Sequence, residues 1–178
     1  MKIFGLVGWS GSGKTTLVVR LLDELIGRGY TVSTMKHTHH NFDMDTPGKD
    51  SYEHRMAGAH EVLVTSTRRW ALMHELRDEA EPDMETHIAR MTPVDLLLIE
   101  GFKTYRHDKI EVHRPSVGKP FLYEEDPTVA ALASDEPLEG VKIPVLDLND
   151  AAAIADFIIA HQKMTAGIGP TPEGGIRQ

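Results

Sequence analysis

A glycine-rich segment near the N-terminus carries the residue types that bind phosphate. Its residues fit the pattern G-x-x-x-x-G-K-[ST], with an apolar run before it and an amphipathic stretch after it. That context predicts a strand, a phosphate-binding loop and a helix in succession. The predicted nucleotide-binding residues are Gly8, Ser10, Gly11, Ser12, Gly13, Lys14, Thr15 and Thr16.

Each residue type in this segment has a physical role. The first turn of a helix has backbone N–H groups without intrahelical partners, and the helix dipole adds partial positive charge there. Glycines let the backbone curl around a phosphate without Cβ clashes. We expect Lys14 to supply positive charge to the β- and γ-phosphates, and so to assist any hydrolysis. Thr15 is expected to ligate Mg²⁺, and Thr16 to support the α-phosphate.

An acid at the end of a neighbouring strand is the second requirement of such a site. The apolar run that begins at Leu96 ends in Glu100, which we predict to be a Mg²⁺ ligand together with Thr15. Asp95 starts the same run and is expected at the opposite end of the strand. Lys103 lies close by and is a candidate phosphate contact, although a solvated surface lysine is an equal alternative.

Two aspartates follow the next predicted strand. Asp43 and Asp45 lie two residues apart, so both point the same way in an extended segment. Either can bind Mg²⁺ through water or orient an attacking water, which makes both candidate catalytic residues. The alternative is turn chemistry before Pro47-Gly48.

A histidine cluster precedes these aspartates. His37, His39 and His40 fit either a zinc or nickel site or a polar loop that contacts nucleotide, and we include His37 among the nucleotide-binding candidates. Arg68 and Arg69 form a cationic pair at an expected turn, where a solvated turn is the simpler interpretation.

Hydropathy periods predict the elements that position these residues. Strand patterns lie at 2–8, 31–36, 61–66, 70–76, 94–99, 110–112, 121–123, 129–133 and 144–148. Helical spacing lies at 14–29, 50–57, 83–91 and 151–161. Strands alternating with helices predict an α/β P-loop NTPase three-layer fold, with a mostly parallel sheet, helices on both faces and an antiparallel hairpin extension. Residues 1–163 are predicted to form one nucleotide-binding domain, and residues 164–178 a disordered tail.

Composition narrows the class of protein. The 178 residues carry a net charge of −8 and 26% charged side chains, which suits a globular protein and disfavours a nucleic-acid binder. Cysteine is absent, which excludes disulfides, thiolate zinc ligands and a cysteine nucleophile. Neither a signal peptide nor an apolar run of membrane-spanning length is found, so we expect a cytoplasmic protein without a membrane partner.

The residues alone do not decide whether the bound nucleotide is GTP or ATP. Guanine-specific P-loop proteins commonly carry Asn-Lys-x-Asp, and the nearest match here is Leu148-Asn149-Asp150, which lacks the lysine. Asn149 or Asp150 instead caps the last helix in the alternative interpretation.

Three segments in order resemble the molybdopterin-guanine dinucleotide biosynthesis protein B (MobB) family. These are Gly8–Thr16, then Lys36-His37-Thr38-His39-His40 with Asp43-x-Asp45-x-Pro47-Gly48-Lys49-Asp50-Ser51, then Leu98-Ile99-Glu100-Gly101-Phe102-Lys103. The resemblance covers about residues 1–163.

The resemblance implies a GTP-binding protein with weak Mg²⁺-dependent GTPase activity, usually a homodimer. Such proteins assist a separate guanylyltransferase that joins GMP to molybdopterin, so molybdopterin is an implied ligand or partner. The loop from His37 to Asp50 would then face the nucleotide or the pterin. Three alternatives stay open: a GTPase metallochaperone for nickel enzymes, a small-molecule P-loop kinase, and a nucleotide-binding module without turnover.

Overall fold

The structure, a computed structural model, describes residues 1–38, 42–103 and 105–165. These residues form two compact units: residues 1–37 together with the described residues after 91, and the described residues between 38 and 91. The prediction that residues 1–163 act as one domain stays a prediction, and residues 166–178 of the predicted tail lie outside the described part of the chain.

A six-stranded sheet forms the centre of the first unit. Its strands are β1(Lys2–Val7), β2(Val32–Lys36), β5(Leu96–Glu100), β6(Lys109–His113), β7(Val129–Ser134) and β8(Val145–Asp147). They pair in the order β2-β5-β1-β6-β7-β8, and every pair is parallel. All strands therefore end at one edge, where the loops that follow them collect.

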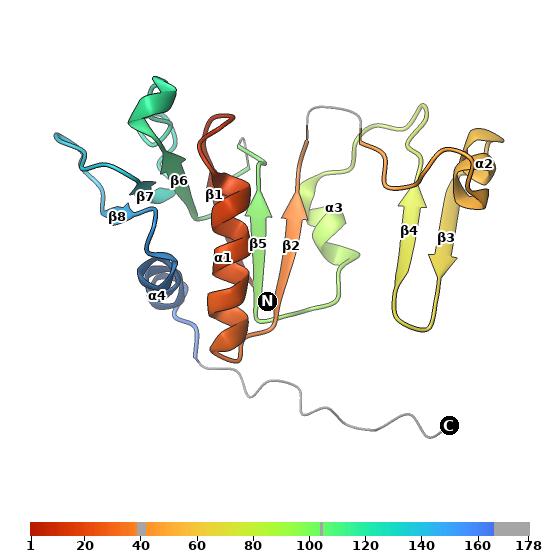
Figure 1. The fold of residues 1–178 in the computed structure, drawn as a ribbon, viewed down its shortest axis with the longest axis horizontal. Coiled ribbons are helices and arrows are strands. Elements are labelled where there is room, and N and C mark those ends of the chain that lie inside the picture. The colour runs from red at the N-terminus through yellow and green to blue at the C-terminus, as the bar shows by residue number, and fades with distance from the viewer. Residues whose placement is uncertain (39–41, 104, 166–178) are drawn as a thin grey trace. The chain divides into compact units, whose positions relative to one another are not determined.

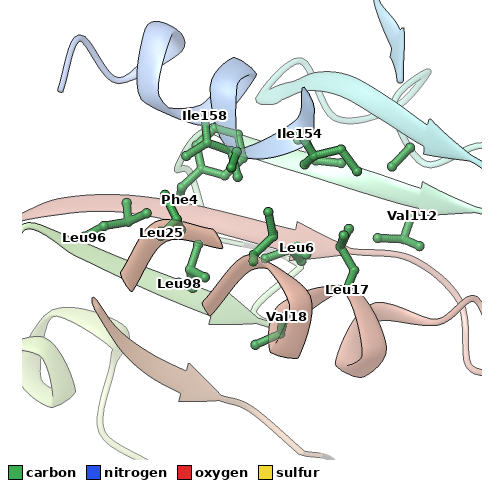
Figure 2. Close-up of a cluster of buried hydrophobic side chains, with 14 of the residues drawn as sticks. Phe4, Leu6, Leu17, Val18, Leu25, Leu96, Leu98, Val112, Ile154 and Ile158 are labelled. Carbon is green, nitrogen blue, oxygen red and sulfur yellow. The ribbon is translucent and has the colours of Figure 1, made fainter. Parts of the chain in front are cut away.

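Two helices, α1(Lys14–Gly27) and α4(Ala151–His161), pack against one face of this sheet (Figure 1). Figure 2 shows their apolar side chains meeting those of β1, β5 and β6. The chain leaves α1 through Gly29, whose φ of +87° is the left-handed conformation expected there. The fully buried members of this core include Phe4, Leu6, Leu17, Leu21, Leu25, Leu96, Ile110, Ile154 and Ile158.

Strand β6 turns a row of polar side chains to the opposite face. Lys109 and Glu111 have no exposed surface, and His113 is 7% exposed. Lys109 Nζ donates to the Tyr105 carbonyl at 2.8 Å and to Asp126 at 2.9 Å. The segments that connect β5 to β6 and β6 to β7 thus cover this face of the strand.

The same contacts correct one prediction. Residues 121–123 form no strand in the described structure but the start of a turn, with 3-10 helix η1(Pro115–Val117) earlier in the connection. The backbone N–H groups of Leu122 and Tyr123 donate to the Glu111 carboxylate, at 2.9 Å each. The buried Glu111 carboxylate accepts the hydrogen bonds that a neighbouring strand would have accepted. The apolar residues 121–123 therefore belong to a turn that covers β6.

The second unit contains α2(Asp50–Met56), β3(Glu61–Thr65), β4(Trp70–His74) and α3(Met84–Ala89). The predicted hairpin is confirmed, because β3 and β4 pair antiparallel. Ser66 Oγ accepts from the backbone N–H groups of Arg68 and Arg69, which lie in its turn. Asp83 caps α3 as expected, through the Thr86 N–H at 2.8 Å. The predicted P-loop NTPase fold is confirmed in its mostly parallel sheet, its helices and its hairpin.

Candidate functional site

The glycine-rich loop connects the carboxyl end of β1 to the first turn of α1. Gly8 and Gly13 have φ values of +148° and +97°, which disfavour any side chain. A Cβ at Gly8 would also lie 2.4 Å from the Val112 carbonyl oxygen and 2.8 Å from Ser12 Oγ. The backbone can therefore make this turn against β6 only with glycine at position 8.

The N-terminus of α1 is capped differently from those of α3 and α4. Asp83 and Asp150 cap the latter two with their carboxylates, which confirms the capping interpretation of Asp150. In contrast, α1 follows left-handed Gly13 without a side-chain cap among the described residues. Its first-turn N–H groups face the loop, an arrangement that suits an anionic ligand.

Lys14 lies over the loop that precedes it. Its Nζ donates to the carbonyl oxygens of Gly8 at 3.0 Å and Trp9 at 2.9 Å. Burial lowers the pKa of Lys14, and the nearby charges of Lys103 and Lys36 lower it further, while Glu100 opposes the shift. The ammonium is thus partly buried on two neutral acceptors, and an entering phosphate would supply the opposite charge that offsets the cost of this burial.

Thr15 and Glu100 come together from separate elements. Thr15 Oγ1 donates to the Glu100 carboxylate at 3.0 and 3.2 Å, and Lys36 Nζ lies 3.4 Å from the same carboxylate. Glu100 aligns with Leu6 and Lys36 in neighbouring strands, as expected for an acid at the end of β5. Adjacent ligands of an octahedral Mg²⁺ with metal–oxygen distances of 2.0–2.1 Å lie about 3 Å apart. The spacing of these two oxygens therefore fits Mg²⁺.

His37 and Lys103 lie near this edge as well. The His37 N–H donates to the Glu100 carbonyl oxygen at 2.9 Å, and its ring lies 4.6 Å from that of Phe102. Lys103 Nζ is 4.7 Å from the centre of the Trp9 ring, a cation–π distance. The first unit thus brings the predicted loop, Glu100, His37 and Lys103 together.

Two further cationic residues at the loop were not predicted. Lys119 Nζ lies 5.7 Å from the Trp9 ring, and the indole Nε1 donates to the Pro120 carbonyl oxygen at 2.9 Å. Arg114 Nε donates to the Ser12 carbonyl oxygen at 3.0 Å. Arg114 directly follows β6, so the strand-end reasoning that selected Glu100 would have found it; no sequence signal marks Lys119.

Asp43 and Asp45 belong to the second unit, where both bind one arginine. Arg55 Nη2 lies 2.9 Å from Asp43 Oδ1 and 2.9 Å from Asp45 Oδ1. The hydrogen bond to Asp45 raises the pKa of Arg55 above its usual value. A catalytic role for either aspartate stays a prediction.

The transition-metal interpretation of the histidine cluster also stays a prediction, since His39 and His40 lie outside the described residues. Among residues 1–38, 42–103 and 105–165, no group of three or more His, Cys, Asp or Glu side chains is arranged to hold a metal ion. The described helices also include none with the length and apolarity to span a bilayer.

A family model described as "MobB: Molybdopterin guanine dinucleotide synthesis protein B" matches residues 3–135. The chain belongs to the MobB family. The membership confirms the resemblance in the sequence and gives the chain a role in molybdopterin guanine dinucleotide synthesis.

Individual MobB relatives are similar to this chain over most of its length. A molybdopterin-guanine dinucleotide biosynthesis adapter protein of Escherichia coli (strain K12) is 44% identical over 168 residues, covering 93% of this chain and 95% of that protein. An adapter protein of the same description from Haemophilus influenzae is 43% identical over 156 residues, covering 88% of this chain and 86% of that protein. The crystal structure of Bacillus subtilis MobB superposes with a TM-score of 0.71 at 25% identity, covering 93% of this chain and 100% of that chain.

Proposed function

We propose that this MobB protein binds Mg²⁺-GTP in the loop Gly8–Thr16 and acts as an adapter for a separate guanylyltransferase that attaches GMP to molybdopterin. The observation that carries the proposal is the convergence of Lys14, Thr15 and Glu100 at an uncapped helix N-terminus. The description of its relatives as adapter proteins supports the second half of the proposal.

In the proposed complex, the loop N–H groups and the first turn of α1 bind the phosphates. Lys14 exchanges part of its bonding to the Gly8 and Trp9 carbonyls for phosphate oxygens. Thr15 and Glu100 would hold Mg²⁺, which when bound offsets the negative charge of the β- and γ-phosphates. Lys103, whose Nζ lies 4.7 Å from the centre of the Trp9 ring, contributes further positive charge.

The proposed GTPase activity is weak, and we assign the orientation of the attacking water to Asp43 or Asp45. Arg55 binds both carboxylates, with Nη2 2.9 Å from each. Lone pairs that accept hydrogen bonds from a guanidinium are not available to a water molecule. Arg55 occupies one acceptor position of Asp43 and two of Asp45, and a carboxylate has about four, so both aspartates keep positions that can accept from a water.

The proposal includes a homodimer that acts in the cytoplasm. Among the residues that the structure describes, seven of the eleven exposed large apolar side chains lie in the second unit, including Leu63, Trp70 and Leu72 of the hairpin. Leu63 and Leu72, which pair across the strands, are 61% and 49% exposed. An isolated two-stranded hairpin is marginal in water, so these side chains favour burial against a second copy of the chain.

The dimer is tested by light scattering after gel filtration. Leu72→Asp is expected to give a monomer, because it would bury a charge in the interface. Val145→Asp, at an exposed apolar position on β8, is the matched control and is expected to leave the dimer intact. A Leu72→Asp protein that stays dimeric at the same concentration would contradict the assignment of the hairpin.

Calorimetry with GTP and with ATP, each with Mg²⁺, tests the nucleotide assignment. A clear preference for GTP supports the proposal, and removal of Mg²⁺ with EDTA should weaken triphosphate binding. A preference for ATP together with a phosphorylated small-molecule product would favour a kinase instead. Addition of the protein to guanylyltransferase, molybdopterin and GTP should raise the yield of the dinucleotide, with Lys14→Ala as the inactive control.

A further inference from the structure

Arg114 lies behind the phosphate-binding loop, at the carboxyl end of β6. Its Nε donates to the Ser12 carbonyl oxygen at 3.0 Å, and its Nη1 binds the Asp135 carboxylate just after β7. The guanidinium also packs beneath Gly13, since a Cβ built there would lie 3.4 Å from both Nε and Nη2. One side chain thus connects the loop to the ends of two strands.

The hydrogen bond to Ser12 fixes the orientation of one particular peptide group. In a trans peptide the carbonyl and the N–H of the next residue point in opposite directions. The Ser12 carbonyl points at Arg114, so the Gly13 N–H points to the side of the loop away from the guanidinium. A cation on the carbonyl also polarises the peptide and makes its N–H a stronger donor.

The loop needs such a support because its glycines do not orient it by themselves. Gly11 and Gly13 have positive φ values of 83° and 97°, and a Cβ at Gly11 would meet nothing within 4 Å. Glycine peptides in open space can flip at little steric cost. Ser12, in contrast, is 2% exposed and lies against β6, where Arg114 can hold its carbonyl.

We propose that Arg114 is a positioning residue that orients the Ser12–Gly13 peptide toward a bound phosphate, and that Asp135 anchors Arg114 for this role. The inference rests on the proposed binding of nucleotide in the loop. Arginine suits the position because its planar fork donates to two acceptors in fixed directions, whereas a lysine ammonium is a point donor. Because Asp135 balances the charge of Arg114, the pair acts by orientation and not by attraction at a distance.

A positioning role and a direct γ-phosphate contact differ in what they predict for diphosphates. Orientation of a loop peptide affects GDP and GTP alike, since both carry the phosphates that the loop surrounds. A cation that reached the γ-phosphate would weaken GTP binding selectively. The ratio of the two losses therefore separates the roles.

Calorimetry of Arg114→Gln with GDP and with GTP, each with Mg²⁺, is the test. We expect the affinity for both nucleotides to fall by the same factor of about ten, which corresponds to the loss of one charge-assisted contact. Arg114→Lys should lose less than Arg114→Gln, and Asp135→Asn about threefold. In the variant that combines Arg114→Gln with Asp135→Asn, the losses should not add, because both changes disrupt one network. Arg20→Gln, at an exposed position of α1, is the control and should bind as the wild type.

A measurement without nucleotide keeps this inference separate from the proposed function. The amide resonance of Gly13 in a ¹⁵N-labelled sample should shift in Arg114→Lys and Asp135→Asn, with the melting temperature showing that each variant is folded. Failure of the wild type to bind any nucleotide would refute the proposed function, while an unmoved Gly13 resonance would refute the positioning role. Unchanged affinity in a folded Arg114→Gln, or a loss confined to GTP, would also overturn it.

Discussion

Replacement of Lys14 by alanine separates the binding of phosphate from the stability of the fold. In the structure the ammonium donates to two loop carbonyls, those of Gly8 and Trp9, and burial already lowers its pKa. Each such hydrogen bond contributes about 1 kcal/mol net, and the cost of desolvating the charge offsets part of that. We therefore expect the free energy of unfolding to change by no more than about 1 kcal/mol.

The effect on nucleotide binding should be larger. A charge-assisted contact to phosphate contributes about 2 kcal/mol or more, so Lys14→Ala should weaken Mg²⁺-GTP binding at least about thirtyfold. The loss should shrink as salt is added, because part of it is electrostatic.

Denaturant unfolding and calorimetry on the same preparation measure the two quantities. Lys142→Ala removes an exposed lysine outside the loop and should change neither. Triphosphate binding by folded Lys14→Ala at wild-type affinity would refute the location of the phosphates. A loss of stability as large as the loss of affinity would instead show that Lys14 mainly holds the loop together.

Three further predictions concern the protein without ligand. Gly5→Ala should lower the free energy of unfolding by about 2 kcal/mol, because the new Cβ would lie 2.3 Å from the His107 ring. Gly27→Ala, with open space around its Cβ position, should raise the free energy of unfolding by about 0.5–1 kcal/mol. Chemical denaturation measures both changes, and equal effects would contradict the close contact between Gly5 and His107. Burial and then Lys109 lower the pKa of His107, so the unfolded chain binds more protons as pH falls. Stability should thus be full above about pH 6.5 and decline below it, and His107→Gln should remove that part of the decline in unfolding experiments from pH 8 to pH 5. Asp45→Asn should lower the melting temperature more than Asp43→Asn, since their side chains are 4% and 67% exposed; the reverse order would exclude Asp45 as the main partner of the shared arginine.

Much of the site could be predicted because its signals are local. The phosphate-binding loop needs glycines, a lysine and a hydroxyl at fixed spacing, since backbone conformation and ligand chemistry act on consecutive residues. Glu100 could be predicted because a fully apolar run implies a buried parallel strand, and the acid that ends it must lie at the edge. The hairpin and the caps of α3 and α4 followed from equally short patterns.

The contacts of β6 could not be predicted from such local patterns. Alternation around Ile110 and Val112 indicates one apolar face, and the polar residues between them would ordinarily face water. Lys109 and Glu111 are instead completely buried, because distant connecting segments supply acceptors and donors for them. The same connection turned an apolar run at 121–123 into a covering turn.

The sequence by itself determined the chemistry of the loop, the helix that begins after it and the strands beside it. Only the tertiary structure decided what supports the loop from behind, since Ser12 and Arg114 lie 102 residues apart in the chain. Local patterns follow from backbone geometry and burial over a few residues. The partner of a given polar group depends instead on which strands become neighbours, and that is settled by the fold as a whole.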